Sequence, residues 1–248
     1  MVAAPQSNRS AVVVGVGAPR GLGAAIARRF AREGFRVTIL GRSAEKVQAA
    51  LQELRDSGAR AEAVIGDVTD EALVRRVVAA ADAPEAPLEA AIFNAGGNWP
   101  KGFLAMDAAF LEDMWRTNAL AGFFFAKAAL EAMLPRQRGT LLFTGATASL
   151  RGRANFGGFA SAKAALRALA QSAAREFGPQ GIHVAHVVVD GAIDGDRINT
   201  FLPSLKEQRG ADGLLDPDAI AESFWDLHRQ QRSAWTHELD VRPWSESW

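Results

Sequence analysis

Two residue types are missing from this chain of 248 residues: it has no cysteine and no tyrosine. The absence of cysteine excludes disulfides, thiolate metal sites and cysteine nucleophiles. The absence of tyrosine is more unusual, because the chain has 14 Phe and 6 Trp. It removes the phenol, one of the side chains that can act as a general acid, from every mechanism open to this chain.

An excess of charge of either sign is also missing. The chain has 28 basic and 28 acidic side chains, a balance that argues against a nucleic-acid or anionic-membrane surface. The longest stretch without a charged residue, Phe177–Val189, is too short to span a bilayer. The first ten residues lack the apolar segment of a signal peptide. We therefore expect a cytoplasmic protein without nucleic-acid or membrane partners.

Short runs rich in Val, Ile, Leu and Phe alternate with segments of helical periodicity along the chain. The predicted strands are Ala11–Gly15, Arg36–Leu40, Ala61–Gly66, Leu88–Asn94, Thr140–Thr144 and His183–Val189. The predicted helices are Leu22–Glu33, Ala44–Ser57, Glu71–Ala81, Ala108–Leu134, Ala160–Phe177 and one from Asp216-Pro217 toward Gln231. This alternation predicts an α/β fold, a single-domain Rossmann-type doubly wound parallel sheet of about seven strands with helices on both faces. We expect residues 1–248 to form one domain, in which 191–215 is an irregular loop on the substrate side.

A glycine-rich stretch joins the first predicted strand to the first predicted helix. It runs from Gly15 to Gly23 with the sequence GVGAPRGLG. Glycines at such a junction let the backbone turn tightly and approach a pyrophosphate, whose charge is stabilised at the helix N-terminus. The alternative is a purely structural turn between a strand and a helix.

The spacing of these glycines resembles that of the short-chain dehydrogenases/reductases. Their signature is T-G-x-x-x-G-x-G, and Gly17, Gly21 and Gly23 fall on its glycines, with Val16 at the threonine position and Leu22 before the last glycine. The resemblance extends from Ala11 to about Val241. It implies a nicotinamide cofactor and hydride transfer.

Further motifs keep the spacing of that family. Phe93 stands at the first position of the N-N-A-G turn that follows the fourth strand, and Asp190 stands where the family usually has proline. The additional cofactor-binding positions that the resemblance implies are Asp67, Val68, Asn94, Ala95, Gly96 and Ile193.

The end of the second predicted strand bears on the choice of cofactor. An NAD site places a carboxylate there to bind the ribose hydroxyls. Here the strand ends with Ile39-Leu40-Gly41-Arg42, without an acid. Arg42 offers a charged planar fork that suits a 2′-phosphate, and Arg20 in the glycine turn offers a second charge. These residues favour NADP over NAD; the alternative is that both arginines are solvated surface residues.

The catalytic positions depart from the family pattern. The resemblance implies a Ser and a Tyr that bind the substrate oxygen, a Lys that binds the ribose, and an Asn that holds a water and a helix irregularity. Lys163 and Asn118 match the Lys and the Asn, whereas Phe159 occupies the Tyr position and Ala146 the Ser position. Losing a positioned acid costs about 10²- to 10⁴-fold in rate. Lys163 is left to bind the ribose or to relay a proton itself.

Three functions are compatible with this pattern. The first is an NADP-dependent reductase with a non-standard active site, acting on an activated C=C or a carbonyl without a tyrosine acid. The second is a catalytically inactive homologue that serves as a nucleotide-binding sensor or assembly partner. The third is an ordinary carbonyl reductase, which would need an acid that the sequence does not offer.

A few residues outside these motifs are weaker candidates. Trp99 follows the N-A-G turn and is placed to line the substrate entrance, while Arg151 and Arg153 are candidates to meet an acidic substrate. His183 and His186 lie an odd number of positions apart on one strand, so they should face opposite sides and share no metal. The resemblance also implies a homodimer or homotetramer packed through the Asn118 and Lys163 helices.

Overall fold

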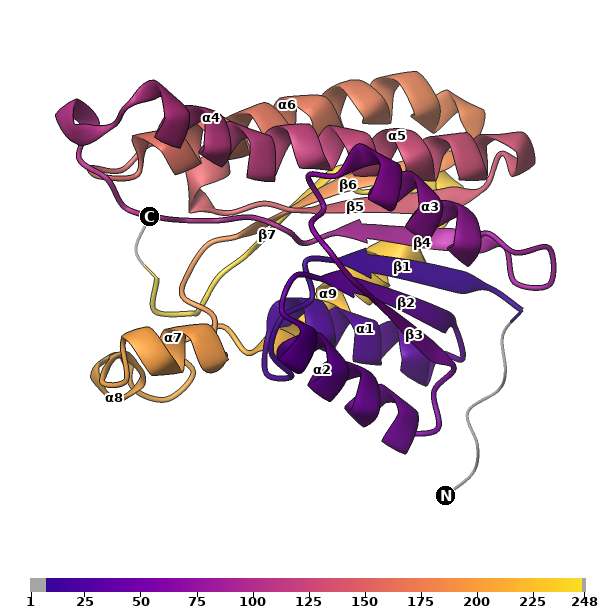
Figure 1. Ribbon diagram of the computed structural model, residues 1–248, viewed down its shortest axis with the longest axis horizontal. Coiled ribbons are helices and arrows are strands. Elements are labelled where there is room, and N and C mark those ends of the chain that lie inside the picture. The colour runs from indigo at the N-terminus through magenta and orange to yellow at the C-terminus, as the bar shows by residue number, and fades with distance from the viewer. Residues whose placement is uncertain (1–7, 247–248) are drawn as a thin grey trace.

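The computed structural model describes residues 8–246, which form a seven-stranded parallel sheet between two layers of helices (Figure 1). The strand order is β3-β2-β1-β4-β5-β6-β7. The strands are β1 (Ser10–Val14), β2 (Arg36–Gly41), β3 (Ala61–Ile65), β4 (Leu88–Phe93), β5 (Gly139–Thr144), β6 (Ile182–Val189) and β7 (Glu238–Val241). The order reverses between β1 and β4, and in such sheets ligands bind at the carboxyl ends of the strands beside this point. The predicted fold class is confirmed.

Helices cover both faces of the sheet. They are α1 (Leu22–Arg32), α2 (Ala44–Asp56), α3 (Glu71–Ala81), α4 (Ala108–Trp115), α5 (Ala121–Met133), α6 (Gly157–Phe177), α7 (Asp196–Phe201), α8 (Leu205–Arg209) and α9 (Pro217–His228). In Figure 1, α4, α5 and α6 lie above the sheet, whereas α1, α2 and α9 lie below it.

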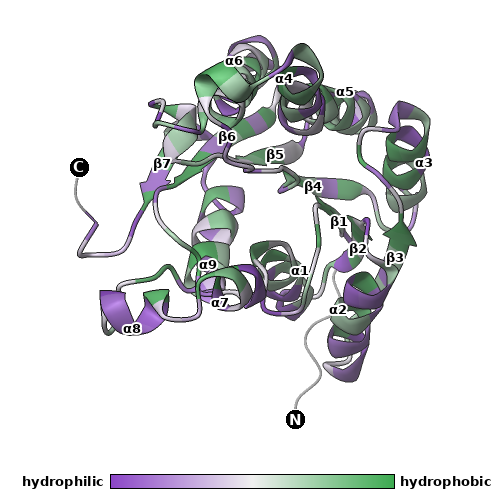
Figure 2. Ribbon diagram, turned by 60° about the vertical axis from the view of Figure 1, so that its left-hand side comes forward, coloured by the Kyte–Doolittle hydropathy of each residue, from purple (hydrophilic) through white to green (hydrophobic). Residues whose placement is uncertain are grey.

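Each face of the sheet is buried in its own apolar core. On the face covered by α1, α2 and α9, the largest buried side chains include Phe30, Phe35 and Phe224. On the face covered by α3, α5 and α6, Phe93, Phe125 and Phe143 pack together. The hydrophobic sides of the helices accordingly point toward the sheet (Figure 2). Burial on both faces explains why the strands read as continuous apolar runs.

One segment differs from the sequence expectation, and two further elements agree with it and add detail. The segment 191–215 was expected to be an irregular loop, but it contains the short helices α7 and α8, which Figure 1 shows outside the two helical layers. The long helix 108–134 is interrupted by one turn of π-helix, Arg116–Leu120. The seventh strand, β7, follows α9 and pairs with β6 at the edge of the sheet.

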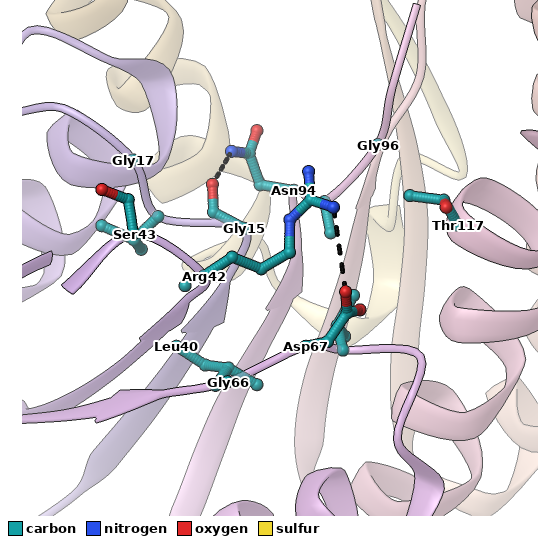
Figure 3. A pocket seen from close by; sticks show the side chains of 14 residues that line it. Gly15, Gly17, Leu40, Arg42, Ser43, Gly66, Asp67, Asn94, Gly96 and Thr117 are labelled. Atoms are coloured by element: carbon teal, nitrogen blue, oxygen red, sulfur yellow. Dashed lines mark hydrogen bonds and ion pairs between the residues drawn. The ribbon is translucent and has the colours of Figure 1, made fainter. Parts of the chain in front are cut away.

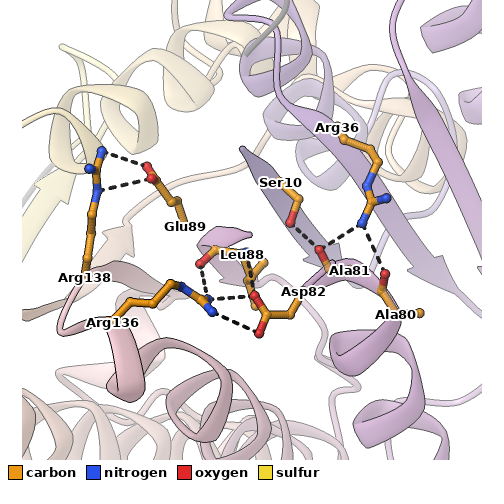
Figure 4. Close-up of polar contacts among 9 residues, drawn as sticks. All are labelled: Ser10, Arg36, Ala80, Ala81, Asp82, Leu88, Glu89, Arg136 and Arg138. Carbon is orange, nitrogen blue, oxygen red and sulfur yellow. Dashed lines mark hydrogen bonds and ion pairs between the residues drawn. The ribbon is translucent and has the colours of Figure 1, made fainter. Parts of the chain in front are cut away.

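Charged side chains tie together the amino ends of the strands (Figure 4). The Glu89 side chain, on buried β4, binds Arg138, while Asp82 accepts a hydrogen bond of 2.6 Å from Arg136. The Ser10 hydroxyl donates to the carbonyl of Ala81. These polar contacts connect the amino ends of the strands. A site is therefore expected at the opposite, carboxyl ends.

Within residues 8–246, no helix is both long enough and apolar enough to cross a bilayer. Leu111 and Trp115 on α4 and Phe123 on α5 are exposed apolar side chains. They lie on the two halves of the helix expected to pack between subunits. The homodimer or homotetramer and the cytoplasmic location stay predictions.

Candidate functional site

The glycine turn and the end of β4 approach each other closely at the carboxyl end of the sheet. Gly15 has φ of 83°, and a Cβ there would lie 2.3 Å from the backbone nitrogen of Ala95. Asn94 fixes this approach, because its amide donates to the Gly15 carbonyl at 3.1 Å and its side-chain oxygen accepts from the Thr144 hydroxyl at 3.0 Å. One side chain therefore joins the ends of β1, β4 and β5.

A cavity of about 290 Å³ opens beside this turn. Its volume lies near the lower end of the range for small-molecule pockets, about 300–1,000 Å³, so it suits part of a dinucleotide. It is lined by Gly15, Val16, Gly17, Leu40, Gly41, Arg42, Ser43, Gly66, Asp67, Val68, Asn94, Ala95, Gly96 and Thr117. Seven of the predicted cofactor residues are among them, drawn from the ends of four neighbouring strands. The residues present fit the nucleoside end of a dinucleotide.

Arg42 and Asp67 face each other across this cavity (Figure 3). The guanidinium and carboxylate are 3.7 Å apart, and the two side chains are 69% and 44% exposed. Ion pairs this exposed contribute about 0–1 kcal/mol. Arg42 can therefore give up its ion pair with Asp67 and bind a phosphate instead at little cost in free energy.

Arg20 is directed away from the cavity, toward the segment before α7. Its guanidinium lies 3.8 Å from Asp194, and its backbone N–H donates to the Asp196 carboxylate at 3.3 Å. Gly195 makes this approach possible, since a Cβ there would lie 2.4 Å from the Arg20 carbonyl oxygen. Ile193 lies on the same segment, where it pairs with Leu215. The segment thus rests on the glycine turn.

The start of α1 completes the turn. Gly21 precedes the helix and Leu22 is its first residue, buried in the core. A Cβ at Gly23 would lie 2.9 Å from the Gly15 carbonyl oxygen. Close packing of helix on strand at this point requires glycine, as the dinucleotide-binding fingerprint does.

Lys163, on α6, is a buried cation beside the cavity. Its side chain is 5% exposed, and its ammonium donates to the Thr144 carbonyl at 2.9 Å. Burial lowers the pKa of Lys163 to about 8. The ammonium lies 5.9 Å from the centre of the Phe159 ring, where the family has a phenol. Lys163 therefore remains mostly protonated at pH 7 but releases a proton far more readily than an exposed lysine.

Asn118 lies in the π-helical turn, the irregularity that the resemblance implies at this position. Its amide donates to the carbonyls of Met114 and Gly97. Its side-chain oxygen is buried without a partner among the described residues. A Cβ at Gly96 would lie 2.5 Å from this oxygen and 3.3 Å from the Lys163 ammonium, so both polar groups converge on Gly96. Such single π-helical turns often occur at functional sites.

Neither Phe159 nor Ala146, the two residues that depart from the family pattern, has a hydroxyl group. Phe159 is half-buried on the first turns of α6. At Ala146 the backbone N–H donates to the Ser149 hydroxyl at 3.1 Å, which occupies that hydroxyl as an acceptor. The nearby Thr147 hydroxyl donates to Asp190. The Thr147 hydroxyl is therefore engaged as a donor, and the Ser149 hydroxyl is engaged as an acceptor.

Sequence reasoning missed the role of Asp190 at the end of β6. This carboxylate is 3% exposed, accepts from Thr147, and lies 3.8 Å from Arg151 and 3.6 Å from Arg242. It ties the loops after β5 and β7 to β6. The only signal in the sequence was an acid at the usual proline position.

The two histidines of β6 point to opposite faces, as their spacing predicts. His183 stacks on Trp235, whereas His186 bonds Glu238 at 3.1 Å. Burial lowers the pKa of His186 to about 4. Over residues 8–246, no cluster of three or more His, Asp or Glu side chains has a metal-binding arrangement.

The strand order and the glycine turn at its reversal point define a Rossmann-type dinucleotide-binding protein. The profile of the short chain dehydrogenase family matches residues 11–200. The chain belongs to this family of oxidoreductases.

Individual relatives agree with this assignment. A crystal structure of a short-chain dehydrogenase from Rhodopseudomonas palustris is 37% identical, with a TM-score of 0.82 over 96% of this chain and 100% of that one. A metagenomic short-chain oxidoreductase in complex with NADP is 26% identical, with a TM-score of 0.79 over 96% of this chain and 98% of the other. The "inactive 2-(S)-hydroxypropyl-CoM dehydrogenase 2" of Xanthobacter autotrophicus is 33% identical over 68% of this chain and 71% of its own length.

Proposed function

We propose that this chain is an NADP(H)-dependent oxidoreductase that reduces an activated C=C or a carbonyl without a tyrosine acid. The observation that carries the proposal is the buried Lys163 ammonium at Gly96, beside the Arg42 cavity. The solved relative in complex with NADP supports the choice of cofactor. When bound, the cofactor supplies the hydride.

The chain's own residues supply binding and charge. In this proposal Arg42, which lines the cavity, binds the 2′-phosphate, and the glycine turn binds the pyrophosphate. The Lys163 ammonium donates one hydrogen bond to Thr144 and retains further N–H groups for a ribose hydroxyl or a developing enolate. With its pKa at about 8, Lys163 is also the group able to hold or release a proton near neutrality. A C=C substrate suits this arrangement, because its enolate needs stabilisation more than immediate protonation.

The first test concerns cofactor binding. The protein is titrated with NADPH and with NADH, and binding is followed by Trp fluorescence. We expect NADPH to bind more tightly, and Arg42→Ala to weaken NADPH binding about 10- to 100-fold while leaving NADH binding little changed. Arg42→Lys is the matched control and should recover part of the affinity. Failure of NADPH to bind the wild-type chain would refute the proposal.

The second test concerns catalysis. It measures NADPH oxidation in the presence of a panel of enoyl thioesters and a panel of carbonyl thioesters. A second candidate function, a catalytically inactive homologue that acts as a nucleotide sensor or assembly partner, is favoured by Phe159 and Ala146 together. The relative whose name calls it inactive also supports this candidate. NADPH binding without oxidation across both panels would select it over the reductase.

A further inference from the structure

Arg197 lies where α7 meets the loop that follows β4. Its guanidinium carbon is 5.3 Å from the centre of the Trp99 ring. Trp99 comes three residues after Gly96, the glycine on which Asn118 and Lys163 converge. The loop that carries Trp99 therefore runs from the Lys163 site to Arg197.

The acids nearest to Arg197 in sequence are engaged elsewhere. Asp194 accepts from Lys206 at 2.6 Å and from Asn199 at 2.9 Å. Asp196 accepts from the backbone of Arg20 at 3.3 Å. Asp194 also lies 3.8 Å from the Arg20 guanidinium, so both carboxylates contact the glycine turn.

Within the part of the chain that the structure describes, no carboxylate forms an ion pair with Arg197. Burial, without an opposing charge, lowers the pKa of Arg197. The residue is nevertheless exposed to solvent, so its guanidinium, held on the indole ring, remains open to an anion. Arg197 is thus a positioned cation that lacks a counter-charge.

The neighbouring side chains add an apolar surface. Phe201 is four residues after Arg197 on the same helix, so the two side chains lie on one face, and Phe201 is 66% exposed. Trp99 is 53% exposed. An acid with a short apolar chain matches a cation flanked by these two rings.

We infer that Arg197, held on Trp99, binds the carboxylate of a substrate that is a small organic acid with an apolar chain. A planar guanidinium pairs with a carboxylate through two parallel hydrogen bonds. This inference rests on the proposed function, because it specifies the substrate class of the same site. It makes Arg197 a specificity-determining residue.

The test uses isothermal titration calorimetry with hexanoate and its uncharged analogue hexanamide, on full-length protein with and without NADPH. We expect hexanoate to bind about tenfold or more tightly than hexanamide. Arg197→Gln should abolish this preference, and Arg197→Lys should keep part of it. Trp99→Leu, which keeps the charge but removes the ring, should reduce the preference. Arg175→Gln, an exposed arginine in the last turn of α6, should leave it unchanged.

Equal affinity of the wild-type chain for the acid and the amide would overturn the inference, and so would a preference that survives Arg197→Gln. Circular dichroism of each variant separates misfolding from loss of binding. Because the readout is acid binding, it is independent of turnover. If NADPH fails to bind but Arg197 still selects the acid, the proposed function fails while the Arg197 assignment stands.

Discussion

Phe159 and Lys163 place an aromatic ring and an ammonium side by side at the position where the family transfers a proton. The ring centre lies 5.9 Å from the lysine nitrogen. A hydroxyl on this ring would have a neighbouring cation to lower its pKa. At this position the side chain differs from a tyrosine by a single oxygen atom.

We therefore predict that Phe159→Tyr with Ala146→Ser creates carbonyl reductase activity. The phenol would donate the proton that an alkoxide needs, and the serine would add a hydrogen bond to the substrate oxygen. The expected gain in the rate of NADPH oxidation with carbonyl substrates is about 10²-fold or more. Phe159→Leu with Ala146→Ser is the control and should show no gain. If the double variant binds NADPH but reduces carbonyls no faster than the wild type, Phe159 does not occupy the acid position.

At the residue scale, the family spacing predicts candidate site positions but not which side chains form pairs. The family spacing leads directly to Gly17, Lys163 and Asn118. By contrast, Thr147 bonds Asp190 across 43 residues and His186 bonds Glu238 across 52. Such pairs depend on how strands and loops pack in three dimensions. Neither partner belongs to a local sequence motif that would predict the contact.

At the element scale, the strands were predictable because burial on both faces makes each one a continuous apolar run. The predicted bounds of β1 to β6 agree with the structure within one residue. The strand β7 gives no such signal, since it is short, polar and only partly buried. The helices α7 and α8 have six and five residues, too few to show an amphipathic period.

The segment around α7 is held on the glycine turn by acidic side chains. The Asp196 carboxylate lies 3.3 Å from the Arg20 backbone nitrogen, beside the start of α1. A helix N-terminus attracts negative charge, so this carboxylate competes with a cofactor phosphate for the same region. Cofactor binding should therefore be coupled to release of this contact.

We predict that Asp196→Asn strengthens NADPH binding about three- to tenfold, because the amide keeps an acceptor oxygen but removes the charge that repels the pyrophosphate. The measurement is the NADPH dissociation constant at low and high salt, and the gain should shrink as salt screens the charge. Glu222→Gln, an exposed acid on α9, is the matched control. Unchanged or weaker binding by Asp196→Asn would contradict competition at the turn.

At the scale of the whole molecule, buried histidines link stability to pH. His228 lies among Phe30, Phe35 and Trp225, between α9 and the sheet, and its ring bonds the Thr140 hydroxyl. Burial lowers the pKa of His228 to about 4. The ordinary value is about 6.5, so between these values the unfolded chain binds more protons than the folded one.

The free energy of unfolding should therefore fall as the pH drops from about 6.5 to about 4. For His228 the loss is on the order of a few kcal/mol. Urea unfolding at several pH values measures it, and His228→Gln provides the comparison because glutamine can still bond Thr140 but does not titrate. The variant should show a shallower decline with acid. Equal slopes for both proteins would show that protonation of His228 does not destabilise the fold.

The hydrogen bonds that shape the site end largely on backbone carbonyls. Asn94 donates to Gly15, Lys163 to Thr144, and Asn118 to Met114 and Gly97. None of these contacts passes through position 146 or 159. These hydrogen bonds are therefore independent of the side chains at positions 146 and 159. A hydroxyl can therefore be introduced at either position without breaking any of these contacts.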